Sequence, residues 1–196
     1  NTARKLDGDG FDTYFALATF KETGSRKVNN VKQLRSFFLD LDCGPSKDYQ
    51  NQNEAIAALR SFCKQLSLPK PLLVNSGRGV HVYWFLSQPI DLKDWLPVAE
   101  HIKRLCLKYN LLADPAVTSD AARVLRIPET HNYKSDPPHD VTHFGTGVIE
   151  PIDFDVFVKY FNDDPIPVPT KHIPSNSNAV MDALLGNRKI YSRTLF

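Results

Sequence analysis

The sequence predicts an α+β domain in which helices pack against a mixed, mostly antiparallel sheet. Aromatic-rich segments predict strands, two segments with apolar residues at helical spacing predict helices, and clusters of Gly, Pro and Asn separate them. The resulting order, ββαββαβ, is typical of an α+β domain. Of the 196 residues, 42% are hydrophobic and 11% aromatic, which suffices for a core and excludes a wholly disordered chain.

The first strands are expected at 14–20, which is dense in aromatic residues, and at 35–42. A helix follows over about 52–67, where Asn51 and Glu54 can form a capping box. The remaining strands are expected at 72–75, 80–86, 111–114 and, as a pair, within 141–150.

A second helix is expected to end near Tyr109, and a closing helix to cover 151–161. Because Pro97 is best tolerated in a first turn, Asp94 is a better start for the second helix than Asp91.

The polar stretch 115–138 is expected to be irregular. From Asp163 onward prolines alternate with small and polar residues, which is typical of an extended linker. We therefore expect one domain over 1–162 and a Pro-rich linker and C-terminal segment over 163–196. That Pro-rich end and the start at Asn1 without Met favour a fragment of a longer protein.

Composition excludes several classes of protein. Lys and Arg total 24 against 22 Asp and Glu, so the net charge of +2 excludes a polybasic nucleic-acid coat but not binding at a local patch. No apolar run is long enough to span a bilayer, and no secretory signal is present. The dispersed Cys43, Cys63 and Cys106 disfavour a thiolate zinc site and suit a reducing compartment.

The first candidate site is the acidic pair at the end of the second strand. Alternation along a strand turns Phe37, Leu39 and Leu41 to one face and Asp40 and Asp42 to the other. Two adjacent carboxylates repel each other, and Mg²⁺ or Mn²⁺ would relieve that repulsion. A pair of solvated acids before a Gly-Pro turn explains the same residues.

The second candidate is the turn Ser76-Gly77-Arg78-Gly79 with His81 after it. Glycines on both sides of Arg78 allow close approach of a ligand and offer backbone N–H groups to an anion. Alternation places His81 on the face opposite the aliphatic stripe of its strand. A Gly-rich hairpin turn with an incidental His is the simpler interpretation.

The third candidate is the segment that follows Asp114, a further carboxylate at a predicted strand end. Arg123 and Arg126 offer bidentate donors to phosphate, and the segment runs on to Lys134. A charged surface loop is the alternative.

Together, Asp-x-Asp, Ser-Gly-x-Gly-x-His-x-Tyr-Trp and Asp followed by Arg-x-x-Arg-x-Pro-x-Thr-x-Asn-x-Lys resemble the archaeo-eukaryotic primase (AEP) superfamily. The match is nearest to the primase-polymerases of phages, plasmids and mobile elements, and it covers about residues 10–160. The resemblance implies an RRM-like catalytic domain.

By position, the resemblance implies catalytic, metal-binding acids at Asp40, Asp42 and Asp114, with Asp120 as the fallback for the third. It implies nucleotide contacts at Ser76, Arg78, His81, Arg126 and Lys134. Glu129 stands where relatives usually have Gly, which leaves the path of this loop and the roles of Asn132 and Lys134 open. The zinc cluster of some relatives is also missing.

The implied activity is that of a DNA primase or polymerase, a nucleotidyltransferase that makes or extends primers on single-stranded DNA. Its substrates would be NTPs or dNTPs, its cofactor Mg²⁺ or Mn²⁺ in a two-metal mechanism, and Tyr133 is a candidate for stacking on the template. A helicase, fused or encoded nearby, is an expected partner. We expect a cytoplasmic location in a bacterial, archaeal or virus-infected cell.

Three alternatives stay open. A haloacid-dehalogenase-like phosphatase would use Asp40 and Asp42 within a parallel sheet. A replication-initiator nuclease would use a Tyr nucleophile, although His81-Val82-Tyr83 lacks its second His. A catalytically inactive domain would only bind single-stranded DNA, although clustered acids do not help such binding.

Overall fold

A computed structural model describes residues 2–145 and 148–161. The strands are β1 (Tyr14–Ala16), β2 (Ala18–Phe20), β3 (Val31–Leu41), β4 (Leu72–Asn75), β5 (Val80–Asp91), β6 (Val124–Arg126), β7 (Thr130–Asn132) and β8 (His139–His143). The helices are α1 (Thr2–Gly8), α2 (Gln52–Gln65), α3 (Leu92–Lys108), α4 (Pro115–Thr118) and α5 (Phe154–Lys159), with a 3₁₀ helix η1 at Val28–Asn30.

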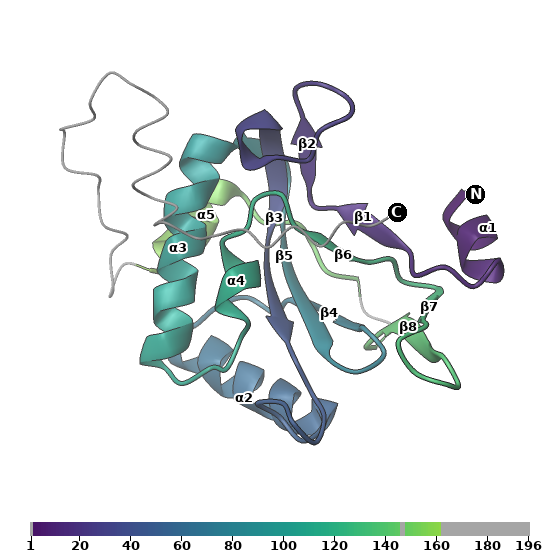
Figure 1. The fold of residues 1–196 in the computed structure, drawn as a ribbon. Coiled ribbons are helices and arrows are strands. Elements are labelled where there is room, and N and C mark those ends of the chain that lie inside the picture. The colour runs from purple at the N-terminus through teal and green to yellow at the C-terminus, as the bar shows by residue number, and fades with distance from the viewer. Residues whose placement is uncertain (1, 146–147, 162–196) are drawn as a thin grey trace. The chain divides into compact units, whose positions relative to one another are not determined.

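The main sheet has the strand order β2-β3-β5-β4-β8-β7, and β1 and β6 form a separate pair. Every pairing between these strands is antiparallel. In Figure 1, α2, α3 and α5 gather on one side of β3 and β5, whereas α1 lies near β7 and β8. The predicted fold class is therefore confirmed. Among the described residues, no helix has the length and apolar character needed to cross a membrane.

The core lies between the helices and the central strand pair, β3 and β5. Phe37 of β3 is opposite Trp84 of β5, and both are 1% exposed. Trp95 of α3 stacks on Phe37 at 5.8 Å and donates from its indole Nε1 to the carbonyl of Ser36 at 2.8 Å. Phe157 of α5 stacks on Phe37 from 5.1 Å. Large aromatic side chains thus hold one face of the pair against the helices, and the other face is left for the candidate site.

The capping box predicted for the first long helix is present, with one difference. The side chain of Asn51 accepts a hydrogen bond from the Glu54 amide at 3.1 Å, while the Glu54 carboxylate accepts one from the Gln50 amide at 2.9 Å. The return bond therefore reaches one residue further than the motif requires.

The strand predicted at 14–20 is wrong in extent, because the chain bends at Leu17. The amide of Leu17 donates to the carbonyl of Arg123, β1 pairs with β6, and β2 pairs with β3. The aromatic content predicts both halves as strand. Which partner strand each half pairs with is decided by tertiary structure.

The predicted start of α3 at Asp94 is also wrong, since the N-cap is Asp91 and Pro97 lies inside the helix. A proline there removes one helical hydrogen bond and costs about 3 kcal/mol. Burial of Trp95 and Ala99 on either side of it provides compensating packing.

Other boundaries differ after Leu111. No strand forms at 111–114; instead, Asp114 caps α4, and the stretch expected to be irregular contains α4, β6 and β7. The pair expected within 141–150 is the single strand β8 in the described residues. The predicted segment 163–196 lies outside the described residues, so the division at 162 stays a prediction.

The turn between β4 and β5 is tied to three parts of the fold. The Gly79 amide donates to the hydroxyl of Ser76 at 3.1 Å, and the side-chain amide of Asn132 in β7 donates to the Ser76 carbonyl at 2.8 Å. Gln52 of α2 donates to the Gly79 carbonyl at 3.0 Å. A Cβ at position 79 would stand 2.5 Å from the carbonyl oxygen of Leu41, so only glycine fits against the end of β3.

Glu129 adopts the left-handed conformation that a glycine would take, with φ of 65°. Its amide donates to the Val141 carbonyl at 2.7 Å, and its carboxylate meets Arg4 at 2.6 Å, although both side chains are mostly exposed. The sequence left the path of this loop open, and the loop follows the path that a glycine favours. Glu129 therefore adopts a left-handed conformation that is unfavourable for a residue with a side chain.

We expect Glu129→Gly to raise the free energy of unfolding by up to about 1 kcal/mol, because it relieves the left-handed strain and loses only an exposed ion pair. Glu129→Val should lower it by about 1 to 2 kcal/mol, since a β-branched residue tolerates positive φ poorly. Urea unfolding measures both. Equal stability of the two variants would contradict this account.

Gly79→Ala should lower the free energy of unfolding by more than about 2 kcal/mol, because its methyl group would collide with the backbone of β3. Gly8→Ala is the control, since nothing lies within 4 Å of a Cβ there. Thermal unfolding of the two variants makes the comparison, and a Gly79→Ala protein as stable as the control would refute the close approach.

Candidate active site

The candidate site is built on a cross-strand pair at the ends of β3 and β5. Asp40 lies directly opposite His81, and the carboxylate oxygen Oδ1 is 3.9 Å from the imidazole Nε2. The two side chains are 16% and 6% exposed. Alternation therefore brings both to the sheet face away from Phe37 and its helices, as the sequence predicted.

The other predicted acids approach Asp40 from different directions. Asp42 lies just beyond β3, and its carboxylate meets the ammonium of Lys47 at 2.7 Å. The backbone amide of Asp114 donates to the Asp40 carbonyl at 2.9 Å, which fixes the third acid beside the first. The fallback, Asp120, uses its carboxylate to hold the amide of Ala122 at 3.0 Å.

Burial and the neighbouring carboxylates change the protonation of this pair. Burial, with the charges of Asp42 and Asp114, raises the pKa of Asp40 to about 7, although Arg123 and Lys47 oppose the shift. At neutral pH, repulsion from the neighbouring carboxylates therefore opposes the loss of the proton from Asp40. An added cation would relieve that repulsion.

His81 shifts in the other direction. Burial and the guanidinium groups of Arg126 and Arg123 lower its pKa to about 4. His81 is therefore a neutral imidazole at physiological pH, and its 3.9 Å approach to Asp40 is not an ion pair.

The three acids suit a hard divalent cation by their chemistry, because they are carboxylates that repel one another. The ammonium of Lys47 already neutralises Asp42 in the way a metal would. Within residues 2–145 and 148–161, however, no three His, Cys, Asp or Glu side chains are grouped closely enough to hold a metal as they stand. Binding by all three acids would require Lys47 to leave and side chains to turn.

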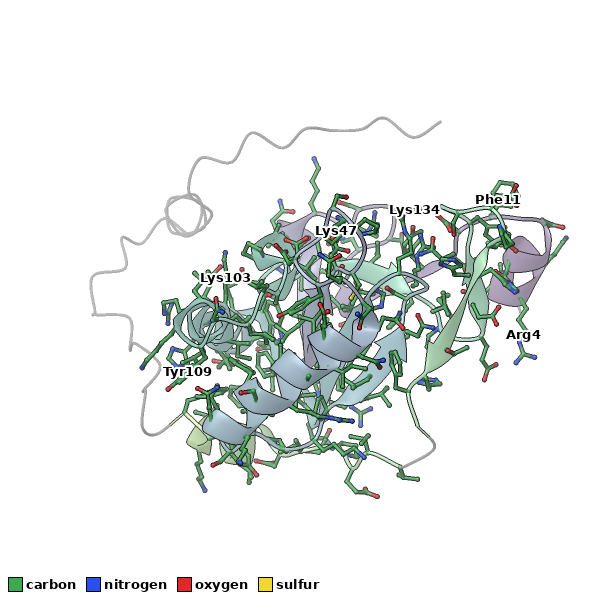
Figure 2. The ribbon with its side chains drawn as sticks, turned by 90° about the horizontal axis from the view of Figure 1, so that it is seen from below. Arg4, Phe11, Lys47, Lys103, Tyr109 and Lys134 are labelled. Atoms are coloured by element: carbon green, nitrogen blue, oxygen red, sulfur yellow. The ribbon has the colours of Figure 1, made fainter. Side chains whose placement is uncertain are left out.

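The structure separates the residues predicted to contact a nucleotide. Ser76 is buried and uses its hydroxyl inside the turn. Arg78 is exposed and close enough to Lys47 to affect the pKa of that ammonium, and Lys134 is also exposed. In Figure 2, Lys47 and Lys134 lie along one edge of the molecule. Lys47 and Arg78 thus border the acids, whereas Ser76 shapes the turn.

Arg126 is largely occupied by structural contacts. Its two terminal nitrogens lie 2.6 and 3.1 Å from the carboxylate oxygens of Asp12, and its guanidinium sits 4.9 Å from the centre of the Tyr14 ring. These contacts join β6 to the segment before β1. Its predicted nucleotide contact would have to coexist with them.

Arg123 was offered by the sequence as a donor to phosphate, but the resemblance assigned the nucleotide contact to Arg126 alone. The Nε of Arg123 is buried and has no hydrogen-bond partner in the described part of the chain. It is close enough to oppose the rise in the pKa of Asp40 and to lower the pKa of His81. The motif offered both arginines, but only the fold reveals that Asp12 binds Arg126 and leaves Arg123 facing the acids.

Comparison with known proteins gives a consistent result. No protein-family profile matches the chain. A replication protein from Clostridium perfringens is 31% identical over 137 residues, which is 67% of this chain and 32% of that protein. The chain thus spans about a third of the length of this curated relative.

Among solved structures, the AEP domain of the cyanophage S-2L primase-polymerase aligns with a TM-score of 0.60 and 18% identity over 85% of this chain and 76% of that one. The polymerase domain of ligase D from Mycobacterium tuberculosis, solved with DNA, aligns with a TM-score of 0.48 and 17% identity over 78% and 60% of the two chains. The resemblance predicted from the motifs is confirmed at the level of structure, and the chain has the fold of the AEP superfamily.

Proposed function

We propose that this domain is a template-dependent nucleotidyltransferase that makes or extends primers on single-stranded DNA, acting in the cytoplasm with Mg²⁺ or Mn²⁺. The observation that carries the proposal is the cluster around Asp40, whose pKa rises to about 7 beside Asp42 and Asp114. A site that concentrates negative charge and borders it with Arg78 and Arg123 suits a cation together with a polyphosphate, and Lys134 is a further candidate contact. The AEP fold and the similarity to a replication protein support the same class.

In the proposed reaction, the 3′-oxygen of the primer forms a bond to the α-phosphorus of a nucleotide, and the bond to pyrophosphate breaks. Asp40, Asp42 and Asp114 would hold the cations, whose chemistry when bound would be to lower the pKa of the 3′-hydroxyl and to neutralise the pyrophosphate. The proton of the hydroxyl would pass to solvent. Arg78 and Arg123 would orient the triphosphate, because guanidinium groups bind phosphate oxygens in pairs.

His81 would contact the triphosphate as a neutral donor. The hydroxyl of Tyr83 lies 3.4 Å from Nδ1 of His81, and burial raises the pKa of that phenol, so it keeps its proton. A hydrogen bond from Tyr83 to Nδ1 leaves the imidazole proton on Nε2, the atom that faces Asp40. That N–H can donate to a phosphate oxygen without adding a positive charge.

The alternatives are disfavoured by the fold. The phosphatase interpretation needs a parallel sheet, whereas all pairings between the described strands are antiparallel. The nuclease interpretation would need Tyr83 as an accessible nucleophile, but that side chain is 2% exposed.

We expect Asp40→Asn to reduce nucleotide incorporation at least about 1,000-fold while leaving stability unchanged or raised, because the amide removes a repelled, buried carboxylate. Primer extension on single-stranded template with Mn²⁺ and labelled nucleotides measures activity, and thermal unfolding measures stability. Asp48→Asn, an exposed acid on the neighbouring loop, is the control. Undiminished product from Asp40→Asn, or no product from the unaltered protein, would reject the proposal.

Arg123→Gln and Arg126→Gln should have different effects. We expect Arg123→Gln to raise the KM for the nucleotide more than about tenfold with little loss of stability, since its Nε has no partner to lose. Arg126→Gln should instead lower the free energy of unfolding by about 2 kcal/mol, because Asp12 loses its charged partner. Nucleotide titrations and urea unfolding separate these results, and identical effects would contradict the assignment.

A further inference from the structure

The hairpin formed by β2 and β3 carries a concentration of positive charge away from the candidate site. Its segment 21–35 contains Lys21, Arg26, Lys27, Lys32 and Arg35 against one acid, Glu22. The net charge of this segment therefore exceeds that of the whole chain, which is +2. Among the described residues, Arg26, Lys27 and Lys32 form no ion pair, and all three are exposed.

The loop of this basic hairpin has a defined shape. The side-chain nitrogen of Asn30 donates to the carbonyls of Glu22 and Ser25 at 2.8 and 2.7 Å, and its side-chain oxygen accepts from the Glu22 amide at 3.1 Å. The Lys21 amide donates to the Asn30 carbonyl at 2.8 Å. The cations are thus presented on an ordered loop, which reduces the entropy lost when they bind a charged partner.

A cavity of about 440 Å³ lies at the base of the basic hairpin. It is lined by Phe15, Ala16, Leu17, Arg35, Ser36, Phe85, Leu86 and Pro151. The guanidinium of Arg35 is fixed there by the carbonyls of Leu86 and Ser87 at 3.0 and 2.9 Å. Phe15 and Phe85 are only half-buried, so this aromatic pocket offers rings and one oriented cation to a ligand.

The aromatic pocket is separate from the candidate active site. Tyr83 lies between His81 and Phe85 on the same face of β5, and its ring stacks on Phe85 at 5.7 Å. Tyr83 is 2% exposed, so its side chain fills the space between His81 and Phe85. In Figure 1, the connection from β2 to β3 lies at the start of β3. The strand ends at Leu41, on the opposite side. Lys32 and Asp40 are eight residues apart on β3, a distance of about 26 Å.

We propose that the basic hairpin and the aromatic pocket form a second binding site for single-stranded nucleic acid, which holds the strand at a distance from the reaction centre. The proposal rests on the proposed function for the identity of that strand as template. Exposed cations without ion-pair partners, on a hairpin whose base carries aromatic rings and an oriented guanidinium, suit the binding of phosphates and the stacking of bases without sequence preference. Tyr133, a candidate from the sequence for stacking on bases, donates its hydroxyl to the Asp7 carbonyl, and its stacking on the template stays a prediction.

The separation of the two sites predicts a dependence on strand length. A stacked strand advances about 3.4 Å per nucleotide, so about eight nucleotides join Asp40 to the basic hairpin. Oligonucleotides of about 16 nucleotides should therefore bind more tightly than those of six by engaging both sites. Shorter strands should reach only one of them.

The test compares the full chain with a variant carrying Arg26→Gln, Lys27→Gln and Lys32→Gln. We expect the variant to bind a 16-nucleotide strand about tenfold more weakly at low salt and to lose about two units of the slope of log affinity against log salt. Its affinity for a six-nucleotide strand should fall less than its affinity for the long strand, and it should extend primers on a template that short as the unaltered protein does. The control carries Lys64→Gln, Lys93→Gln and Lys159→Gln, the same charge change on exposed helix positions.

Phe85→Leu tests the aromatic pocket, since it keeps apolar volume but removes a stacking ring. It should weaken binding of the long single strand severalfold without changing the salt slope, and thermal unfolding checks that it is folded. Equal affinity, length dependence and salt slope in all proteins would overturn the proposal, as would equal weakening by the control. If the hairpin variant loses long-strand binding while the unaltered protein incorporates no nucleotide, the second site stands and the proposed catalytic function fails.

Discussion

The antiparallel pairing of β3 with β5 is the constraint on which the rest of this structure depends. Its register sets Phe37 against Trp84 on one face and Asp40 against His81 on the other. Because side chains alternate, a slip of one residue would bury the carboxylate and the imidazole under the helices and expose the aromatic core. Packing of Trp95 and Phe157 onto Phe37 thus also fixes the position of the site.

The same pairing determines the electrostatics. Asp40 lies on a rigid, half-covered strand, so it is desolvated while two further carboxylates stand nearby. Such an arrangement has a cost in the free protein that a bound cation would offset, and Lys47 supplies part of that compensation on Asp42. Neutral His81 and the cations around it complete a site with an acidic centre and a basic border, which explains how a chain with a net charge of +2 can suit both metal ions and phosphates.

Several polar residues in or near the predicted motifs hold the fold together rather than face a ligand. Ser76, Asn132 and Gln52 hold the turn that precedes β5, and the tight fit of Gly79 against Leu41 brings that turn to the end of β3. Asp12 holds Arg126 in the same supporting manner. Of the two arginines in the motif, Arg123 is then the one left to act on a ligand.

The sequence alone determined the fold class, the capping box at Asn51 and the placement of Asp40 and His81 opposite the apolar stripes of their own strands, because these follow from local periodicity and alternation. Tertiary structure decided what depends on partners distant in the chain. The bend at Leu17, the proline inside α3 and the position of Asp114 beside Asp40 all depend on packing or backbone bonds that no local pattern encodes. Which arginine faces the acids was decided in the same way, because Asp12 is 114 residues from Arg126 in the chain and only folding brings the two into contact.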